Sequence, residues 1–206
     1  MKLRDLRMLV KHLWGLYVQP KSEWIEIDTH HESLLSVVVN LCLLAFIPAV
    51  SAWYTATVTG WQLGVGETTY LSASSAGLMA VGMVFASIFL VTTFAIFVQW
   101  MASNFGASTS FPQSLELTTY TAAPIFVTGI AALIPIPWLI MMALLVGVAF
   151  SVRSLYTGVP IIMHITEERG FIYASSLLTV GLVLFVATMA FTVIMWSLGL
   201  GPEFIS

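Results

Sequence analysis

Charged residues are scarce in this chain, and their scarcity excludes an ordinary soluble domain. Lys, Arg, Asp and Glu make up 8% of the 206 residues, whereas roughly a quarter of the residues of a soluble domain are charged. Hydrophobic residues make up 59%, and the mean hydropathy is +0.96. Several separate apolar blocks approach the ~20 residues that a helix needs to cross a bilayer. The sequence therefore predicts an all-α membrane protein that crosses the membrane repeatedly.

Cysteine is almost absent, since Cys42 in the first apolar block is the only one. One cysteine can form neither a disulfide within the chain nor a cysteine metal site. The chain also lacks His-Glu-x-x-His, Gly-x-Ser-x-Gly and Cys-x-x-Cys patterns. The stretch Gly64-Val-Gly-Glu67 has no following Gly-Lys-Ser/Thr that could hold a phosphate. We therefore expect no enzymatic activity and no cofactor.

Five apolar runs are expected to form the membrane-spanning helices. They cover approximately residues 34–55, 76–101, 115–134, 138–159 and 171–198. A Pro135-Ile-Pro137 turn joins the third run to the fourth, because paired prolines cannot continue a helix. Residues 33–206 are thus predicted to form one five-helix domain, and residues 1–32 are predicted to lie on the cytosolic side.

The N-terminal segment is predicted to be a basic amphipathic helix. Leucine, valine and tyrosine recur at three- and four-residue spacing over residues 1–18, with Lys2, Arg4, Arg7 and Lys11 at other positions. Such a helix suits the cytoplasmic face of a membrane, where anionic lipid attracts it. A docking surface for a soluble partner is the alternative. Pro20 ends this helix, and residues 23–32 are expected to be an acidic, histidine-bearing connector.

The distribution of basic residues predicts the orientation in the membrane. Five of the seven Lys and Arg residues lie in the first 21 positions. If the N-terminus is inside, Arg153 and Arg169 also fall on the inner side of a five-span chain. This arrangement obeys the positive-inside rule, so we expect a cytoplasmic N-terminus and an external C-terminus.

Four short motifs resemble the Yip family. They are Trp14-Gly-Leu-Tyr-Val-Gln-Pro20, Tyr120-Thr-Ala-Ala-Pro124, Pro135-Ile-Pro-Trp138 and Leu155-Tyr-Thr-Gly-Val-Pro160. Together they make the chain similar to the bacterial inner-membrane branch of that family. The resemblance implies five spanning helices, a cytosolic N-terminus and an inner-membrane location. The Rab-type GTPase binding of eukaryotic relatives is not expected, because the chain lacks their Asp-Leu-Tyr-Gly-Pro signature.

One candidate polar site is expected within the membrane, near its cytoplasmic side. Its members are Glu116, Tyr120, Arg153 and Tyr156. Arg153 precedes Pro160 by seven residues, which places it roughly 10 Å inside the end of its helix at ~1.5 Å per residue. A charge at that depth can mark a substrate or ion site, form a structural ion pair with Glu116, or extend to the headgroups.

A second candidate is a cytosolic surface for a ligand or a protein partner. Its members are Asp28, His30, His31, Glu32, His164, Glu167 and Glu168. Imidazole and carboxylate groups suit divalent transition metals, but a proton sensor or a polar connector that caps the first span would use the same residues. Thr166 and the two carboxylates after it also suit the positive N-terminal end of the last helix.

The sequence predicts a non-enzymatic membrane scaffold or adaptor that contacts lipids and a membrane or cytosolic protein partner. The alternative is a small oligomeric transporter or channel for an ion, a metal or a small solute. It would use Arg153 and Glu116 with the polar residues Asn40, Tyr120, Thr121 and Tyr156. A homo-oligomer is compatible with both. Nucleic acid is not an expected partner, because lipid explains the basic N-terminus.

Overall fold

The computed structural model describes residues 3–61 and 68–205, so the glycine-rich stretch at 64–67 lies outside the described residues. The described chain is almost entirely helical. Its α-helices are α1 (Leu3–Val18), α2 (Pro20–Thr29), α3 (Leu34–Tyr54), α4 (Ala73–Ala102), α5 (Phe111–Thr128), α6 (Pro137–Ile162) and α7 (Glu167–Met195). Short 3-10 segments follow α4 (Ser103–Phe105) and α5 (Gly129–Leu133), and π-helical turns extend α3 (Thr55–Thr59) and α7 (Trp196–Leu200).

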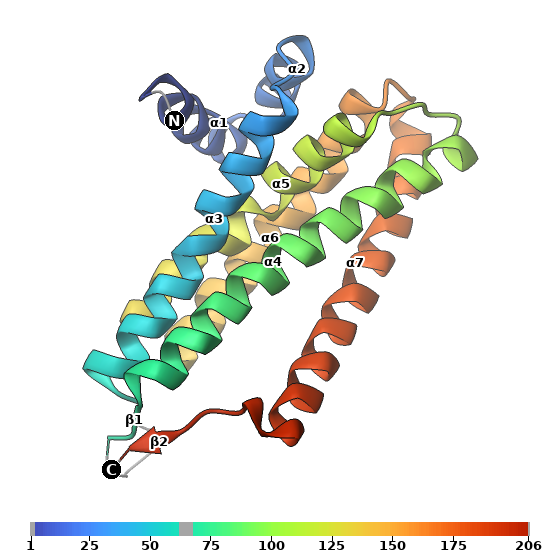
Figure 1. Ribbon diagram of the computed structural model, residues 1–206. Coiled ribbons are helices and arrows are strands. Elements are labelled where there is room, and N and C mark those ends of the chain that lie inside the picture. The colour runs from blue at the N-terminus through green and yellow to red at the C-terminus, as the bar shows by residue number, and fades with distance from the viewer. Residues whose placement is uncertain (1–2, 62–67, 206) are drawn as a thin grey trace.

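Helices α3 to α7 run lengthwise between the two ends of the molecule (Figure 1). The hairpin of α1 and α2 lies at one end, with the N-terminus. At the other end, β1 (Tyr70–Leu71) pairs antiparallel with β2 (Phe204–Ile205), close to the C-terminus. The two termini therefore lie at opposite ends of the helical bundle.

Within the described residues, four helical segments are long and apolar enough to cross a membrane. They are Leu34–Thr59, Ala73–Phe105, Pro137–Ile162 and Glu167–Gly199. Four of the five expected runs are confirmed as candidate spans by this criterion, and the third run is not. Its helix α5 has 18 residues and buries polar side chains such as Ser114, Glu116 and Thr118, which lower its hydropathy although it lies among α3, α4 and α6.

Side-chain caps set the starts of several helices. Ser33, Ser72 and Thr166 precede α3, α4 and α7, and each hydroxyl accepts a hydrogen bond from a backbone N–H in the first turn. This is the usual stabilisation of helix N-termini, where the first N–H groups have no partner within the helix. The capping role predicted for Thr166 is confirmed.

The prediction of a connector after Pro20 was wrong, because residues 20–29 form helix α2. Pro20 occupies the first helical turn, where its fixed φ favours a helix and its missing N–H costs nothing. Trp24 and Ile27 lie three residues apart on one face of α2 and are buried. The acidic residues around them, Glu23, Glu26 and Asp28, hid this apolar face in the sequence.

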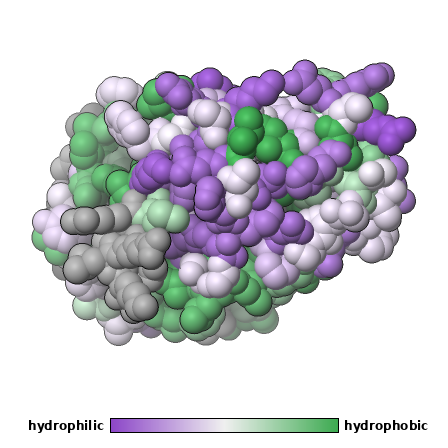
Figure 2. Space-filling model, turned by 90° about the horizontal axis from the view of Figure 1, so that it is seen from above, coloured by the Kyte–Doolittle hydropathy of each residue, from purple (hydrophilic) through white to green (hydrophobic). Residues whose placement is uncertain are grey.

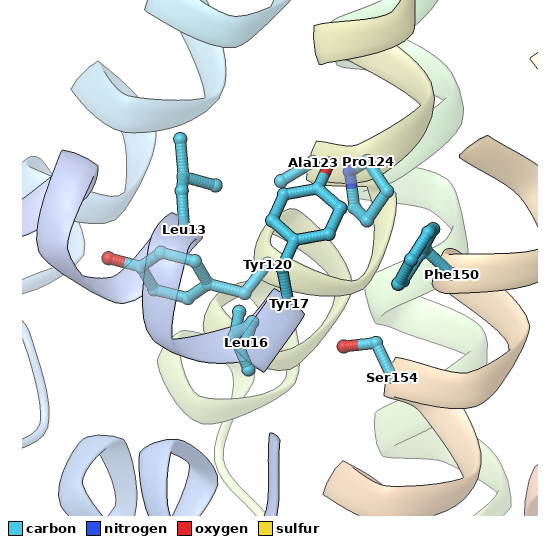
Figure 3. A pocket seen from close by; sticks show the side chains of 8 residues that line it. All are labelled: Leu13, Leu16, Tyr17, Tyr120, Ala123, Pro124, Phe150 and Ser154. Atoms are coloured by element: carbon cyan, nitrogen blue, oxygen red, sulfur yellow. The ribbon is translucent and has the colours of Figure 1, made fainter. Parts of the chain in front are cut away.

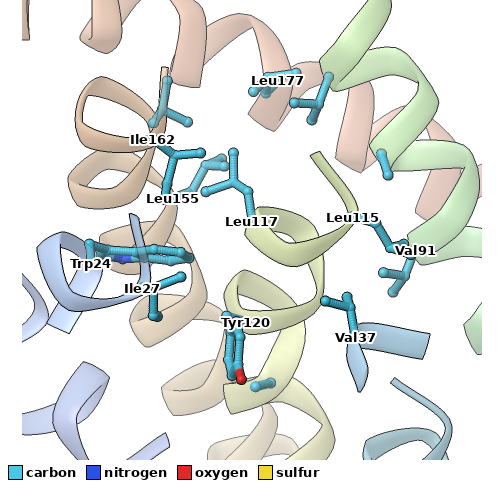
Figure 4. Packing of buried hydrophobic residues seen from close by; sticks show 14 of the residues in the cluster. Trp24, Ile27, Val37, Val91, Leu115, Leu117, Tyr120, Leu155, Ile162 and Leu177 are labelled. Carbon is cyan, nitrogen blue, oxygen red and sulfur yellow. The ribbon is translucent and has the colours of Figure 1, made fainter. Parts of the chain in front are cut away.

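The apolar core is concentrated in the half of the bundle near α1 and α2. Figure 4 shows Trp24 and Ile27 of α2 gathered with Leu117 of α5 and with Leu155 and Ile162 of α6. The buried residues of α7 all fall in its first eleven positions, from Gly170 to Leu177. The rest of α7 exposes large apolar side chains, as expected for a surface that faces lipid.

Candidate functional site

A close contact between Trp24 and Gly158 attaches the α1–α2 hairpin to the bundle. The Trp24 side chain is fully buried. A Cβ atom added at Gly158 of α6 would lie only 2.6 Å from Trp24 Cε2. Glycine is therefore required at this position, because any side chain would push the indole ring away from α6.

A buried imidazole–carboxylate pair joins α1 to α2. His12 Nδ1 lies 2.5 Å from Glu23 Oε1, and the two residues are 3% and 8% exposed. A Cβ atom at Gly15 would lie 1.9 Å from Glu23 Oε2, so a glycine one turn after His12 makes room for the carboxylate. The His12 ring also meets the ring of Tyr120 edge-on, at a centroid distance of 5.7 Å.

A second pair joins the α2–α3 connection to α5. Glu116 is 1% exposed, and its Oε2 lies 3.0 Å from His31 Nδ1. Its Oε1 accepts a hydrogen bond of 3.0 Å from the backbone N–H of Glu32. Because a buried carboxylate without donors is costly, these contacts explain how the acidic residue is tolerated in α5.

Glu32 extends this network towards α3 and α5. Its Oε1 accepts a hydrogen bond of 2.6 Å from the Tyr120 hydroxyl, and its Oε2 accepts one of 2.8 Å from Asn40 Nδ2. Glu32, Asn40 and Tyr120 thus connect the start of α3 to the middle of α5. Within residues 3–61 and 68–205, no hydrogen bond of the Asn40 or Tyr120 side chain continues the network towards the strands.

A third pair joins α2 to the connection between α6 and α7. Asp28 Oδ2 lies 2.9 Å from His164 Nε2, and Asp28 Oδ1 lies 3.8 Å from His31 Nε2. Among the described non-glycine residues, His164 alone has a positive φ, of 50°. Lys21 Nζ and Glu167 Oε1, 3.1 Å apart, add an exposed ion pair between α2 and α7.

An exposed ion pair between Lys11 and Glu26 completes the contact of α1 with α2. The hydrogen bond from Lys11 lowers the pKa of the Glu26 carboxyl, and the carboxylate in turn raises the pKa of Lys11. Both groups are solvated, so the pair contributes little to stability.

The ion pair between Glu116 and Arg153, one of the three alternatives for this site, does not form. Arg153 is exposed, faces away from the buried side of α6 and has no ion pair with any described residue. Tyr156 hydrogen-bonds Ser175 of α7 at 2.8 Å instead of joining Glu116. The structure thus joins Glu116 to Tyr120 through Glu32 and leaves Arg153 and Tyr156 outside the network.

The structure brings Asp28, His31, Glu32 and His164 of the predicted cytosolic surface together and leaves the others outside. His30 is exposed, and within the described residues its ring lies within hydrogen-bonding distance of only Thr29 and the carbonyl oxygen of Glu26. Glu167 pairs with Lys21, and Glu168 is exposed. In the described parts of the chain, no three His, Cys, Asp or Glu side chains are arranged to hold a metal ion.

A small pocket lies where α1 meets α5 and α6. Figure 3 shows side chains from all three helices around it: Leu13, Leu16, Tyr17, Tyr120, Ala123, Pro124, Phe150 and Ser154. Its free volume of about 10 Å³ is close to the space of one water molecule. The Ser154 hydroxyl is buried without a hydrogen-bond partner, as are those of Ser151, Thr119 and Thr121.

Sequence reasoning did not identify every residue of this site. Trp24 and Glu23 were not predicted as members, although both are buried. The sequence signal that could have identified the hairpin was His12 and Gly15, three residues apart on the inner face of an amphipathic helix. A short acidic segment that begins with Pro20 follows this helix. Only the fold shows that these elements form a hairpin.

Comparisons with known proteins give a consistent result. A family model described as the Yip1 domain matches residues 14–188. The chain is 30% identical over 193 residues to the inner membrane protein YohC of Escherichia coli K12, covering 92% of this chain and 98% of that protein. The protein of the same name from strain O6:H1 CFT073 matches with the same identity and coverage. No solved structure matches significantly.

Proposed function

Because the chain belongs to the Yip1 family, we propose that it is a multi-pass protein of a bacterial inner membrane that acts as a non-enzymatic scaffold. The inner-membrane location rests on the name of the YohC relatives. The scaffold role rests on the α1–α2 hairpin, whose inner face is fixed to the bundle and whose outer face is free to bind.

We propose that α5 is a fifth span and that the N-terminus is cytoplasmic. Helix α4 ends at the end of the bundle that carries α1 and α2, while α6 begins at the end that carries the strands (Figure 1). If α4 and α6 both cross the membrane, α5 must cross it between them. The end that carries α1 and α2 has a broad hydrophilic surface (Figure 2), and the basic residues gather in this part of the sequence, which supports its placement in the cytoplasm.

The orientation can be tested with single cysteines in a Cys42→Ser background. The exposed positions Lys21 and Glu203 lie at opposite ends of the bundle. A membrane-impermeant maleimide added to intact spheroplasts should label Glu203→Cys and should label Lys21→Cys only after lysis. The reverse pattern would refute the proposed orientation.

One observation carries the scaffold proposal. On α1, Leu9, His12 and Leu16 are buried against the protein, whereas Val10, Trp14 and Val18 are 58%, 72% and 55% exposed. The exposed three recur every four residues and form one stripe on the opposite face of the helix. An apolar stripe on a rigidly attached helix is suited to contact another membrane protein within the lipid interface.

The stripe can be tested by photo-crosslinking in cells. A photoreactive amino acid at Trp14 should give a discrete protein adduct, and Val18→Ser should reduce that adduct because it changes the same stripe. The matched control is the exposed Leu145 on the outer face of α6, which should give only lipid adducts. Lipid adducts alone at both positions would overturn the proposal.

A transporter is the second candidate, and the unpartnered buried hydroxyls favour it. Thr119 and Thr121 of α5 and Ser151 and Ser154 of α6 are polar groups without partners inside the bundle, and Pro124 removes one backbone hydrogen bond from α5. Unsatisfied polar groups at membrane depth commonly line a pathway. Ion and solute flux into proteoliposomes, compared between the unmodified protein, Ser154→Ala and Arg153→Ala, tests this candidate. A flux that either substitution abolishes would favour it over the scaffold.

A further inference from the structure

Three of the four histidines in this chain pair with a carboxylate on another segment, and all three pairs hold the α1–α2 hairpin. His12–Glu23 joins α1 to α2, His31–Glu116 joins the α2–α3 connection to α5, and His164–Asp28 joins the α6–α7 connection to α2. We propose that these three pairs are a pH-sensitive latch, in which His12–Glu23 holds α1 against α2 and the other two pairs fix the α2 end of the hairpin to the bundle. The latch would regulate the scaffold proposed above. Only its biological role rests on that proposal, because the latch itself is inferred from the three pairs.

The pairs are placed where a change in charge alters the attachment of the hairpin. Glu23 and Glu116 are buried, at 8% and 1% exposure, and His12 is buried with Glu23, whereas 35% of the His31 side chain is exposed. The nitrogen–oxygen distances of the three pairs are 2.5, 3.0 and 2.9 Å. Each pair therefore has hydrogen-bonding geometry that an added charge strengthens directly.

Histidine is the side chain whose charge ordinarily changes between about pH 5 and 8. An imidazolium gives a charge-assisted hydrogen bond roughly twice as strong as a neutral one. A neutral imidazole can still donate from one nitrogen, so a rise in pH weakens each pair without removing it. The attachment should therefore be tight in mildly acidic conditions and looser in mildly alkaline ones.

The surrounding charges act in the same direction. His12 is close to Glu23 and Glu26, with Lys11 paired to Glu26. His31 faces Glu116 and, more distantly, Asp28, with the amide of Gln113 on its other nitrogen. Glu32 lies beside Glu116, and Asp28 faces His164. Carboxylates thus outnumber cations around the three imidazoles. When the imidazolium groups lose their charge, the negative charge of these carboxylates is compensated less.

The proximity of these pairs to the pocket gives the latch a structural consequence. Leu13, Leu16 and Tyr17 of α1 cover Pro124 of α5 and Ser154 of α6 (Figure 3). Release of the hairpin would uncover this surface of α5 and α6 and change the position of the exposed stripe on α1. A change in pH would then alter what the scaffold presents at its cytoplasmic end.

The test uses spin labels on the full-length protein in lipid nanodiscs, with Cys42→Ser as background. Labels at the exposed positions Val18 of α1 and Leu145 of α6 report the position of the hairpin by pulsed electron spin resonance. Between pH 5.5 and pH 8, the population with a displaced hairpin should increase by roughly fivefold for each pair that loses its charge. An identical distance distribution at both pH values would overturn the proposal.

Histidine variants show whether the pairs cause the response. The triple variant H12Q/H31Q/H164Q should show no pH dependence, whereas His30→Gln is the matched control and should respond as the unmodified protein does. If the triple variant does not fold, His164→Gln, whose side chain is 67% exposed, should fold and show a response reduced by one pair. A response that persists undiminished in these variants, or that His30→Gln abolishes, would refute the latch. Loss of the Trp14 adduct with an intact pH response would instead refute the scaffold.

Discussion

Substitution of Gly158 by alanine tests the attachment of the hairpin most directly. The added Cβ atom would lie 2.6 Å from Trp24 Cε2 and 2.9 Å from both Cδ2 and Cζ2. These atoms belong to a rigid, fully buried ring, so the indole must shift as a whole. Overpacking of this kind costs typically 1–3 kcal/mol, and complete loss of the tryptophan contact would cost about 3–5 kcal/mol.

The expected net loss is about 2 kcal/mol, because alanine also gains roughly 1 kcal/mol over glycine inside a helix. Gly82→Ala in α4 is the matched control, since a Cβ atom there meets nothing within 4 Å. Thermal unfolding in nanodiscs should show a lower midpoint for Gly158→Ala and an equal or higher midpoint for Gly82→Ala. Limited proteolysis should also cut between α1 and α3 faster in Gly158→Ala. Equal behaviour of the two variants would refute the close contact.

Three further predictions concern the polar contacts of the hairpin. Gly15→Ala places a Cβ atom 1.9 Å from the Glu23 carboxylate; this group can move more readily than an indole ring, so proteolysis should reveal a smaller loss of stability, about 1 kcal/mol. Glu116→Ala removes the acceptor of two hydrogen bonds and should cost about 2 kcal/mol in thermal unfolding, with partial recovery in Glu116→Gln; an unchanged midpoint would contradict this. The Lys11–Glu26 contact lowers the Glu26 pKa and raises the Lys11 pKa. Its small stabilisation should be lost as pH falls through the carboxyl pKa in the folded protein or rises through that of the amine, and NMR titration of Glu26→Gln should show the Lys11 pKa returning towards its ordinary value.

The main architecture could be predicted from sequence because membrane solvation acts on each helix separately. Four apolar runs are long enough to be recognised one at a time, and Thr166 marks a helix start through local chemistry alone. The family was likewise recognisable from four motifs, and the match over residues 14–188 confirms it. Helix α5 is the exception, because protein surrounds it and its buried residues include Glu116 and several threonines.

The site could be predicted only in part, because its contacts join residues far apart in the chain. Sequence reasoning selected His31 and Glu116 as separate candidates but assigned them to different sites, and it considered an ion pair of Glu116 with Arg153 as one of three alternatives. The actual partner choice depends on the rotation of α6, which turns Arg153 outward, and on the start of α3, which brings His31 to α5. Neither feature follows from helical periodicity alone. Trp24 was overlooked because its counterpart, Gly158, is recognisable only by close approach.

The uneven packing of α7 determines which part of the protein responds to bilayer thickness. Its first eleven residues contain all its buried positions, and the strand after it is paired with β1. Between these attachments the helix has few protein neighbours, and the segment Glu167–Gly199 has 33 residues, more than the ~20 needed to cross. A thinner bilayer would therefore be accommodated by a greater tilt of α7, while the tightly packed half beside α1 and α2 keeps its shape.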